Sequence, residues 1–465
     1  MTDEPNVDVA ASKRSALFVT TLGAFLSPFG ISSVNIALPS IAQEFQMDAI
    51  LLSWVTTTYV LASATFPVPF GKIADIYGRK RVFTCGIVLY TLASFGSAIS
   101  NSSTMLLCSR ILQGIGASAN YSVGAAILTS VFPSRELGKV LGINAAALYL
   151  GLSVGPFFGG FLTQYLGWRS IFLVNIVVGL IILVSVFWKL KGEWREAEKE
   201  RFDLTGSVIY SVTLLLIMYG FSQLSTISGA WLILLGGLGL WGFMKWEAKV
   251  KNPIFNTDLF RNNRAFVFSN LAALISYSST FAVTFLLSLY LQYVKAFSPE
   301  TAGLILLSQP IVQAVMSPFA GKLSDRIEPQ VVASIGMGLT AIGLFFLIFL
   351  TENTTLVFIL ACLVLLGFGF ALFSSPNTNA LMSSVDNRFY GVASGTLGTM
   401  RATGRMFSMG ITILIFSIYI GRVQITPEYH PVFLKCVTFS FSLFAVLCFG
   451  GIFASLARGK VRKKK

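Results

Sequence analysis

The chain contains a long succession of apolar runs, each about as long as a bilayer is thick. A helix crosses the hydrocarbon core with about 20 residues, within a range of roughly 17–25. Hydrophobic residues make up 54% of the chain and charged residues 12%, whereas soluble domains carry about 25% charged residues. The pattern therefore predicts an all-α membrane protein and argues against a soluble domain. Fourteen spans are expected, at residues 16–39, 49–70, 82–99, 104–131, 137–164, 169–189, 205–223, 229–246, 265–292, 300–320, 331–350, 355–383, 390–420 and 432–457.

The distribution of lysine and arginine predicts how these spans are oriented. If the spans alternate in direction, 27 of the 34 basic residues fall in segments on one side and four fall on the other. Positive residues normally stay on the cytoplasmic side. We therefore expect a multi-pass protein of the cell (plasma) membrane with both termini cytoplasmic. The net charge of +14 then belongs to loops beside anionic lipid, so membrane lipid is an expected partner and nucleic acid is not.

Cysteine and histidine usage argues against metal and disulfide chemistry. The five cysteines all lie in apolar runs without close spacing, and His430 is the single histidine. An odd number of scattered cysteines supports neither a disulfide framework nor a zinc site. We expect no metal and no cofactor. The first apolar run is also too long for the roughly 7–15-residue core of a signal peptide, so we interpret it as an uncleaved span.

A short basic segment, Gly71–Arg81, separates two of the predicted spans, and a weaker copy occurs at Gly321–Arg326. A repeated loop between hydrophobic segments suggests two related halves, the usual organisation of secondary transporters. Two apolar spans interrupt the spacing between the copies. The expected division is a tail at 1–15, an N-terminal six-helix bundle at 16–189, linkers with two inserted spans at 190–264, a C-terminal bundle at 265–457 and a basic tail at 458–465.

Both copies combine glycine, lysine and aspartate, and we interpret them as gating loops. A carboxylate placed against basic side chains and a helix N-terminus can hold two halves together in one state and release them in another. The alternative is a basic loop that only sets the topology. The candidate gating residues are Gly71, Asp75, Gly78, Arg79, Lys80, Gly321 and Asp325.

Three arginines, Arg110, Arg401 and Arg405, lie inside predicted spans. A charge at this depth is costly and usually faces a cavity or a partner, although Arg110 could instead reach the outer surface. Arg401 and Arg405 are four residues apart, where like charges repel, so something negative or strongly polar should face them. Every acidic residue falls in a loop or at the end of a span, so no carboxylate is expected at this depth.

Other polar residues in the spans could join the arginines in a substrate cavity, or could simply hold helices together. The candidates are Asn35, Asn120, Tyr121, Gln309 and Gln313. A separate motif aligns Gly151, Gly155 and Gly159 on one helix face, beside Pro156. Glycines allow a second helix to approach closely and proline bends its helix, so both a packing seam and a hinge fit this motif.

These motifs together resemble those of the major facilitator superfamily. Gly71, Asp75, Gly78, Arg79 and Lys80 match the loop between its second and third spans. Arg110, Gln113 and Gly114 resemble its fourth-helix motif, and the Gly151–Gly160 segment resembles the antiporter motif of its drug exporters. The segments Asn35–Ser40 and Gly167–Asn175 look like the fourteen-span drug:proton antiporter family of multidrug efflux proteins. The resemblance implies two six-helix bundles plus two inserted transmembrane helices.

Two positions depart from this family's pattern. The family usually has aspartate five residues before the asparagine at position 35, where this chain has Gly30. It usually has glycine at the position of Arg405. A proton carrier needs a titratable group within reach of the cavity, so these departures weigh against classical proton coupling. They favour neutral or anionic substrates over lipophilic cations.

The expected function is that of a secondary transporter rather than an enzyme. The resemblance implies export of amphiphilic drugs or metabolites by alternating access, with a small-molecule substrate, protons or another coupling ion, and a monomeric chain. A gradient-driven facilitator or importer of neutral or anionic molecules remains an alternative. A polytopic membrane enzyme or sensor is a more remote one, because it would need paired carboxylates or a histidine cluster.

Overall fold

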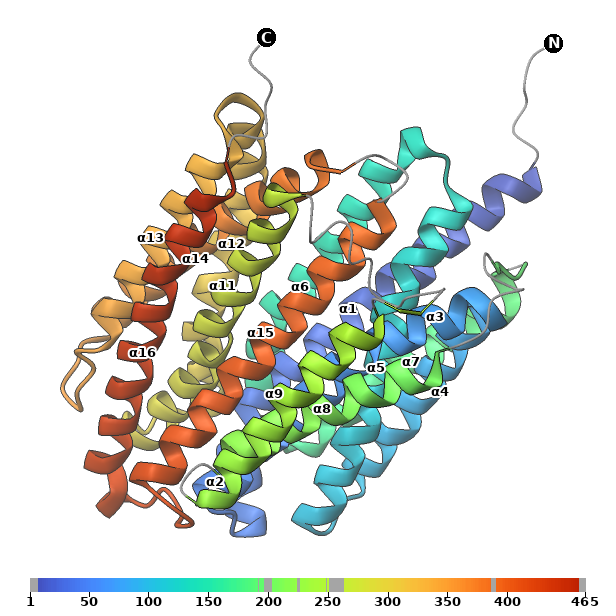
Figure 1. The fold of residues 1–465 in the computed structure, drawn as a ribbon. Helices are drawn as coiled ribbons and strands as arrows, with labels where there is room; N and C mark the ends of the chain where they lie inside the picture. Colours follow the sequence, from blue (N-terminus) through green and yellow to red (C-terminus); the bar gives the residue numbers. More distant parts are fainter. Residues whose placement is uncertain are drawn as a thin grey trace.

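The computed structural model describes residues 7–190, 192–195, 203–223, 226–247, 249–250, 263–385 and 390–459. Within these residues the chain forms helices and no strand, which confirms the predicted all-α class (Figure 1). The first half contains α1 (Val7–Phe45), α2 (Ala49–Thr65), α3 (Pro67–Tyr77), α4 (Arg79–Ala98), α5 (Ser103–Val131), α6 (Ser134–Leu166) and α7 (Arg169–Lys189). A helical pair follows, α8 (Leu204–Ser222) and α9 (Ile227–Glu247). The second half contains α11 (Arg264–Leu289), η1 (Tyr290–Val294), α12 (Pro299–Arg326), α13 (Pro329–Leu347), α14 (Leu356–Ser383), α15 (Tyr390–Tyr419), η3 (Pro427–Tyr429) and α16 (His430–Ala457).

In the part of the chain that the structure describes, fewer than fourteen helices have the length and hydropathy expected of a membrane span. Among the described residues, 12 helices are long and apolar enough to cross a membrane, or 13 if the bent pair α2–α3 counts as one span. The predicted count of fourteen is therefore not confirmed. The remaining predicted span is α5, which is 29 residues long but carries Arg110, Gln113 and Asn120. These polar side chains are buried between helices, where α5 packs against α2 and α4.

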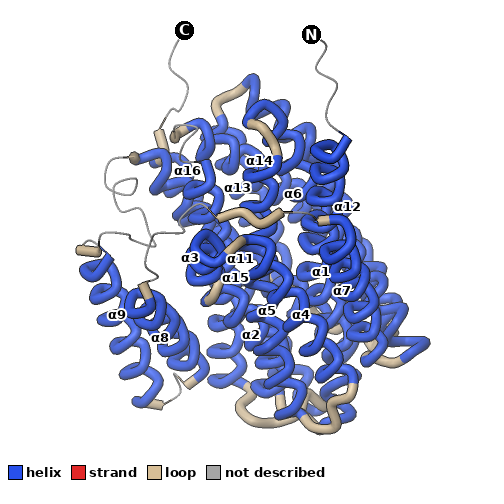
Figure 2. The backbone as a smooth tube through the Cα atoms, turned by 90° about the vertical axis from the view of Figure 1, so that its right-hand side faces the viewer, coloured by secondary structure: helices blue, strands red, loops and turns tan. Residues whose placement is uncertain are grey.

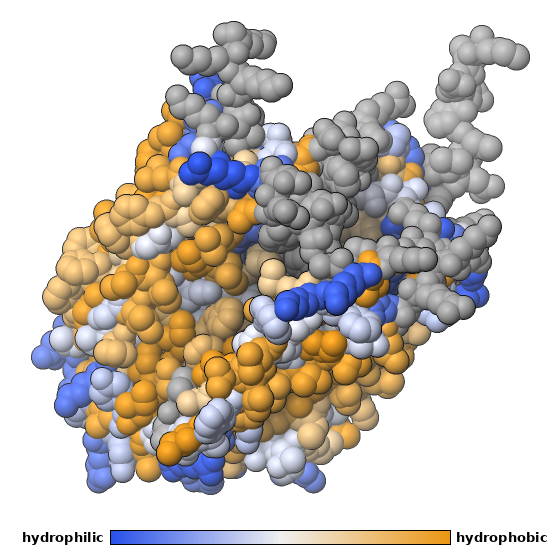
Figure 3. All heavy atoms as spheres, viewed as in Figure 1, coloured by the Kyte–Doolittle hydropathy of each residue, from blue (hydrophilic) through white to orange (hydrophobic). Residues whose placement is uncertain are grey.

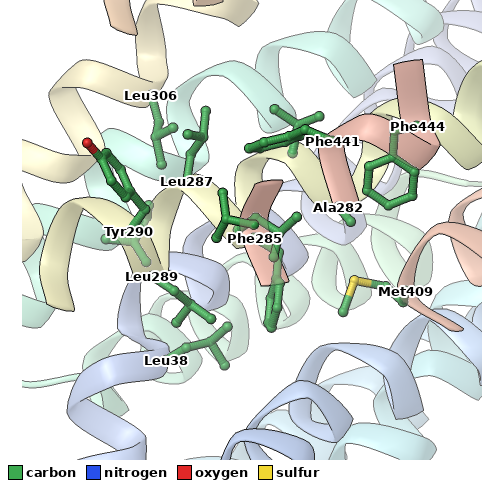
Figure 4. Packing of buried hydrophobic residues seen from close by; sticks show 14 of the residues in the cluster. Leu38, Ala282, Phe285, Leu287, Leu289, Tyr290, Leu306, Met409, Phe441 and Phe444 are labelled. Atoms are coloured by element: carbon green, nitrogen blue, oxygen red, sulfur yellow. The ribbon is translucent and has the colours of Figure 1, made fainter. Parts of the chain in front are cut away.

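The helices pack as two bundles that meet along a few helix pairs. In the first bundle α1 packs against α6, and α4 packs against α5 and α7; in the second, α14 packs against α12 and α13, and α11 packs against α15 and α16. The bundles meet mainly where α6 contacts α12 and α2 contacts α15. Figure 4 shows part of the larger hydrophobic cluster, to which α11 contributes Phe285, α16 contributes Phe441 and Phe444, and α1 contributes Leu38.

The α8–α9 pair lies on the outside of the two bundles. α8 packs against α9, α15 and α2, so it contacts both bundles (Figures 1 and 2). α9 exposes large apolar side chains, among them Trp231, Leu238 and Trp241. The flank of the molecule is apolar while its ends are hydrophilic (Figure 3), as a lipid-facing surface requires. Parts of the predicted linkers and tails, residues 1–6, 196–202, 251–262 and 460–465, lie outside the described residues.

The two ends of the molecule differ in the segments they carry. α1 begins and α16 ends at the same end (Figure 1). We call this the basic end and define it by Gly71–Arg81, Gly321–Arg326 and Arg458. The opposite end contains Glu44, Arg169, Glu300 and Val423.

The two expected gating loops are largely helical, so their prediction as loops is wrong. Gly71–Tyr77 belongs to α3, Arg79–Arg81 begin α4, and Gly321–Arg326 form the end of α12. The chain instead breaks earlier, at Phe66, and Pro67 starts α3 with a bend of 48° from α2. A proline is tolerated in the first turn of a helix because the missing amide has no partner there. Gly78 alone separates α3 from α4, at a φ of +118° that favours glycine.

Candidate functional site

An ion pair at the basic end joins three helices of the first bundle. Oδ1 of Asp75 accepts hydrogen bonds from Nε and Nη2 of Arg79, at 3.0 and 2.8 Å. The same guanidinium donates through Nη1 to the carbonyl of Ala126 in α5, at 3.0 Å, and to the hydroxyl of Ser130. Arg79 is only 5% exposed. The pair thus holds the junction of α3 and α4 against α5.

The segment after α7 folds back over this junction. Oε1 of Glu193 accepts the backbone N–H of Lys80 at 2.8 Å, and the carbonyl of Trp194 accepts the N–H of Arg79 at 3.0 Å. Nζ of Lys80 donates to the carbonyl of Leu190. Unpaired N–H groups at a helix start attract negative charge. The carboxylate at the α4 N-terminus is therefore Glu193, which sequence reasoning missed, although an acid within a basic linker was a usable signal.

The second copy of the basic segment contacts α14. A Cβ on Gly321 would lie 3.2 Å from Oγ of Ser375. Asp325 lies in the last turn of α12, and its side chain is outside the described residues. Gly71, at the corresponding place in α3, has open space around it.

Arg110 is enclosed within the first bundle. It is 0% exposed, so the alternative in which it reaches the outer surface is wrong. Its Nε donates to the carbonyl of Val55 at 3.2 Å, and Nη1 donates to Oε1 of Gln113 at 2.5 Å. Gln113 in turn donates to Oγ of Ser94 at 2.8 Å, and the guanidinium lies 4.4 Å from the ring centroid of Tyr59. Two hydrogen bonds and an aromatic face thus offset part of the cost of burying this charge, while Nη2 has no partner among the described residues.

The place beside Gly30 is occupied by another side chain. A Cβ at position 30 would collide with the hydroxyl of Tyr90 and would lie 3.2 Å from Nδ2 of Asn175. Tyr90 donates to the carbonyl of Leu26 at 3.4 Å, and both polar side-chain atoms of Asn175 are buried without a hydrogen-bond partner among the described residues. An aspartate at position 30 would therefore require Tyr90 to move.

Arg401 and Arg405 of α15 both face the ring of Tyr277 in α11. Their Cζ atoms lie 5.7 and 5.6 Å from its ring centroid. Nη2 of Arg401 also donates to Oγ1 of Thr378 in α14 at 2.7 Å. The strongly polar partner expected from the sequence is thus an aromatic face and a hydroxyl. Nothing in the sequence marked Tyr277, because contact with α15 depends on how the helices pack.

Two further tyrosines lie around this arginine pair. The hydroxyl of Tyr149 in α6 is 2.8 Å from Oγ of Ser374 in α14, a contact between the two bundles. Tyr121 in α5 lies against α15, 3.2 Å from where a Cβ on Gly398 would be, and both tyrosines interact electrostatically with Arg401. We call Tyr121, Tyr149, Tyr277, Arg401 and Arg405 the central cluster. Both arginines are half-buried.

Two other predicted cavity residues, Asn35 and Asn120, hold helices together. Oδ1 of Asn35 accepts from Thr56 at 2.8 Å, and its carbonyl accepts from Ser288 of α11 at 2.8 Å. Nδ2 of Asn120 donates to the carbonyl of Gly23 at 2.7 Å. Gln309 is half-buried, and Gln313 is buried, with Nε2 lacking a partner among the described residues.

The glycine motif of α6 faces α1 along its length. Gly151 meets the carbonyl of Phe25, a Cβ on Gly155 would lie 2.6 Å from Cβ of Ser32, and one on Gly159 would lie 2.6 Å from Cα of Ser33. Pro156 lies inside α6, and its carbonyl contacts Gly303 of α12. These residues form a seam in which α6 lies between α1 and α12.

Hydrogen bonds between the bundles gather at the opposite end. The N–H of Ala49 donates to the carbonyl of Val423 at 2.9 Å. Gln424 donates to Gln46 at 3.0 Å, and Tyr165 donates to Oε2 of Glu300 at 3.0 Å. In this conformation the two bundles are therefore joined at the opposite end.

Comparison with known proteins agrees with this arrangement. The sequence profile described as Major Facilitator Superfamily matches residues 20–409 and, in a second match, 269–464. The riboflavin transporter RibZ of Clostridioides difficile (strain 630) is 31% identical over 392 residues, which cover 84% of this chain and 85% of that protein. The multidrug resistance protein Stp of Mycobacterium tuberculosis (strain CDC 1551 / Oshkosh) is 30% identical over 424 residues, covering 89% and 77%.

A solved structure shows the same fold. The crystal structure of a bacterial homolog to the human lysosomal transporter Spinster, in an inward-facing and unoccupied conformation, aligns with a TM-score of 0.69 at 14% identity, covering 98% of each chain. The narrower drug:proton antiporter branch is not established by these similarities. The helical bundles, the matching profile and the related sequences together show that the chain is a membrane transporter and belongs to the Major Facilitator Superfamily.

Proposed function

We propose that this transporter exports small neutral or anionic molecules with aromatic or other apolar parts across the plasma membrane by alternating access. The observation that carries the proposal is the pair of guanidinium groups, Arg401 and Arg405, whose Cζ atoms lie 5.7 and 5.6 Å from the Tyr277 ring centroid. Two relatives, named as a riboflavin transporter and a multidrug resistance protein, support small organic substrates.

The charge of the central cluster favours anions. Each acidic residue that the structure describes lies in a loop or near a helix end, as Glu44, Asp75 and Glu300 do. A cationic substrate would meet two like charges in a poorly solvated site, where a unit charge pair at 4 Å interacts by about 4 kcal/mol. A carboxylate would accept charge-assisted hydrogen bonds, while the tyrosine rings would pack against an aromatic body.

The proposal also includes the orientation of the chain and the role of the gating residues. The basic end faces the cytoplasm, because lysine and arginine normally stay there, and the chain works as a monomer. Asp75, Gly78, Arg79 and Lys80 form one cytoplasmic latch together with Gly71, and Gly321 and Asp325 form a second. The Gly151–Gly159 seam with Pro156 lets α6 slide against α1. The remaining polar residues of the spans hold the helices in place around the central cluster; they are Asn35, Arg110, Asn120, Gln309 and Gln313.

Transport into membrane vesicles of known orientation tests the substrate class. Fluorescein as an anion, riboflavin as a neutral molecule and ethidium as a cation are offered to inside-out vesicles, with vesicles lacking the protein as the control. Uptake of fluorescein or riboflavin is expected, with little uptake of ethidium. Arg405→Gln should lower fluorescein uptake and raise ethidium uptake. Rapid ethidium uptake by the unaltered protein, unchanged in Arg405→Gln, would refute the proposal.

A facilitator driven by the gradient of its own substrate is the second candidate. The collision between Tyr90 and any side chain at position 30 favours it, because this space cannot hold a titrating carboxylate as the helices stand. Counterflow of fluorescein in liposomes at several pH values, with and without a protonophore, separates the two. Exchange and net uptake that both persist after the proton gradient collapses support the facilitator, whereas arrest of net uptake supports proton coupling.

A further inference from the structure

One short segment of α14 makes polar contacts with α6 of the first bundle and with four other segments of the second half of the chain. Ser374 bonds to Tyr149 of α6, and Asn377 donates through Nδ2 to the carbonyl of Ser269 in α11 at 3.2 Å. Thr378 accepts from Arg401 of α15 at 2.7 Å, and Asn379 donates to Oγ of Ser324 in α12 at 3.0 Å. The segment contains the proline at position 376, which removes one hydrogen bond from the helix. We call Ser374–Asn379 the polar segment of α14.

The fifth contact is Arg458, the residue that follows α16. Its Nη2 donates to Oδ1 of Asn377, and the residue is only 2% exposed. Nε and Nη1 have no hydrogen-bond partner within the part of the chain that the structure describes. Burial lowers the pKa of Arg458 to about 10, so it stays charged at neutral pH. The sequence placed Arg458 in a basic tail beside the membrane surface; the structure places it inside the bundle.

A buried guanidinium restrains the amide that it contacts. Charge-assisted hydrogen bonds are roughly twice as strong as neutral ones, and they strengthen further where water is excluded. The amide of Asn377 accepts from Arg458 on one side and donates to α11 on the other. Its side chain is therefore held at both ends, and with it the helical turn that contains Thr378.

We propose that Arg458 is a positioning residue for the central cluster: through Asn377 it fixes the turn of α14 that carries Thr378, and so aims Arg401. The chain of contacts runs from the end of α16 to α14 and then to α15. The inference rests on the proposed function only in taking Arg401 to contact the substrate. It assigns to the start of the C-terminal tail a role distinct from electrostatic attraction to lipid.

The first experiment compares two arginines of the tail. Arg458→Gln and the control Arg462→Gln remove the same charge. In inside-out vesicles with fluorescein, Arg458→Gln should raise KM about fivefold, the lower end of usual coupling effects, with Vmax per inserted molecule retained. Asn377→Leu should raise KM by the same factor, and the double variant of Arg458→Gln with Asn377→Leu should raise it no further. Arg458→Lys should restore KM in part. Arg462→Gln should leave KM unchanged. Equal effects of both tail variants, or a loss of inserted protein at unchanged KM, would overturn the inference.

A second readout needs no transported substrate. Ser375, half-buried and one helical turn before Thr378, is replaced with cysteine in a chain whose five native cysteines are alanine. Its labelling rates with sulfonate and trimethylammonium methanethiosulfonates report the local charge. The sulfonate should be favoured, and Arg458→Gln should lower this preference toward that of Arg401→Gln, whereas Arg462→Gln should not. If fluorescein is not transported at all, the proposed function fails, but the ratio of the two labelling rates still tests the positioning role of Arg458. A ratio that is unchanged in Arg458→Gln would contradict that role.

Discussion

The side chain of Glu193 packs so closely on Gly78 that a Cβ at position 78 would lie 2.5 Å from its Cδ atom. The same carboxylate caps α4 at the N–H of Lys80, and its Oε2 lies 3.7 Å from Nε of Arg81. The linker that leads from α7 to the α8–α9 pair is thereby attached to the junction of α3 and α4. Because α8 contacts both bundles, this attachment connects the junction to a helix that touches each bundle.

Gly78→Ala should destabilise the protein, because it adds both a collision with Glu193 and an unfavourable φ of +118°. Such backbone strain costs on the order of 1–3 kcal/mol. Thermal unfolding in detergent measures the change. Gly71→Ala is the matched control, since Gly71 is helical with open space around it, and it should be neutral or slightly stabilising. Combining Gly78→Ala with Glu193→Ala should recover only the steric part. Equal melting temperatures for Gly78→Ala and Gly71→Ala would contradict the proposed strain at position 78.

Gly30→Ala should also destabilise, because its Cβ would collide with the Tyr90 hydroxyl. Overpacking of this kind typically costs about 1–3 kcal/mol. Tyr90→Phe removes that hydroxyl together with a long hydrogen bond of 3.4 Å, so the double variant should be more stable than the two single effects predict. Gly450→Ala, with open space around it, is the control. Additive single effects would show that the two positions do not compete for space. Gly30→Asp should likewise be tolerated only together with a smaller residue at position 90.

Tyr277→Leu should weaken handling of the anionic probe, while Tyr277→Phe should not. The ring supports both Arg401 and Arg405, and a cation–π contact contributes about 0.5–2 kcal/mol, which corresponds to about twofold to thirtyfold in KM. The kinetics of fluorescein uptake in inside-out vesicles measure this. Tyr277→Phe keeps the ring and removes only the hydroxyl, so a KM that Phe and Leu raise equally would count against the role of the ring.

A disulfide across the opposite end should stop transport. The N–H of Ala49 lies 2.9 Å from the carbonyl of Val423, so the two backbones approach closely enough for a disulfide. In a chain without native cysteines, Ala49→Cys with Val423→Cys should arrest uptake after oxidation and recover after reduction. Ser334→Cys with Ser455→Cys is the control, because these hydroxyls are 2.9 Å apart within one bundle. Uptake that continues in the oxidised Ala49–Val423 variant would exclude alternating access at this interface.

The position of the break in the second predicted span could not be predicted from the sequence. Gly71 and Gly78 both looked like loop residues, yet only Gly78 ends a helix. A glycine inside a helix costs roughly 0.5–1 kcal/mol, which packing against neighbouring helices readily offsets. The local pattern thus identified the basic segment and its residues, but it did not determine which glycine the chain turns at.

In the candidate site, too, some residues were predictable from the sequence and others were not. Arg110, Arg401 and Arg405 were recognisable from the sequence, because a charge within an apolar run is costly wherever the helix lies. Their partners were not recognisable. Tyr59, Tyr277 and Thr378 belong to helices distant in sequence, and ordinary tyrosines and threonines occur throughout the spans. Arg458 looked like the first residue of a solvated tail and is instead buried.

The sequence by itself determined that this chain is helical, lies in a membrane and belongs with transporters, because span length, low charge and the spacing of short motifs are local properties. Only the tertiary structure decided that Glu193 caps α4, that Tyr90 fills the space beside Gly30, and that Arg458 reaches Asn377. Those facts depend on which helices are neighbours and how they are rotated. Apolar faces pack in many such arrangements with similar burial, so side-chain shape and polar satisfaction across the whole bundle select one of them.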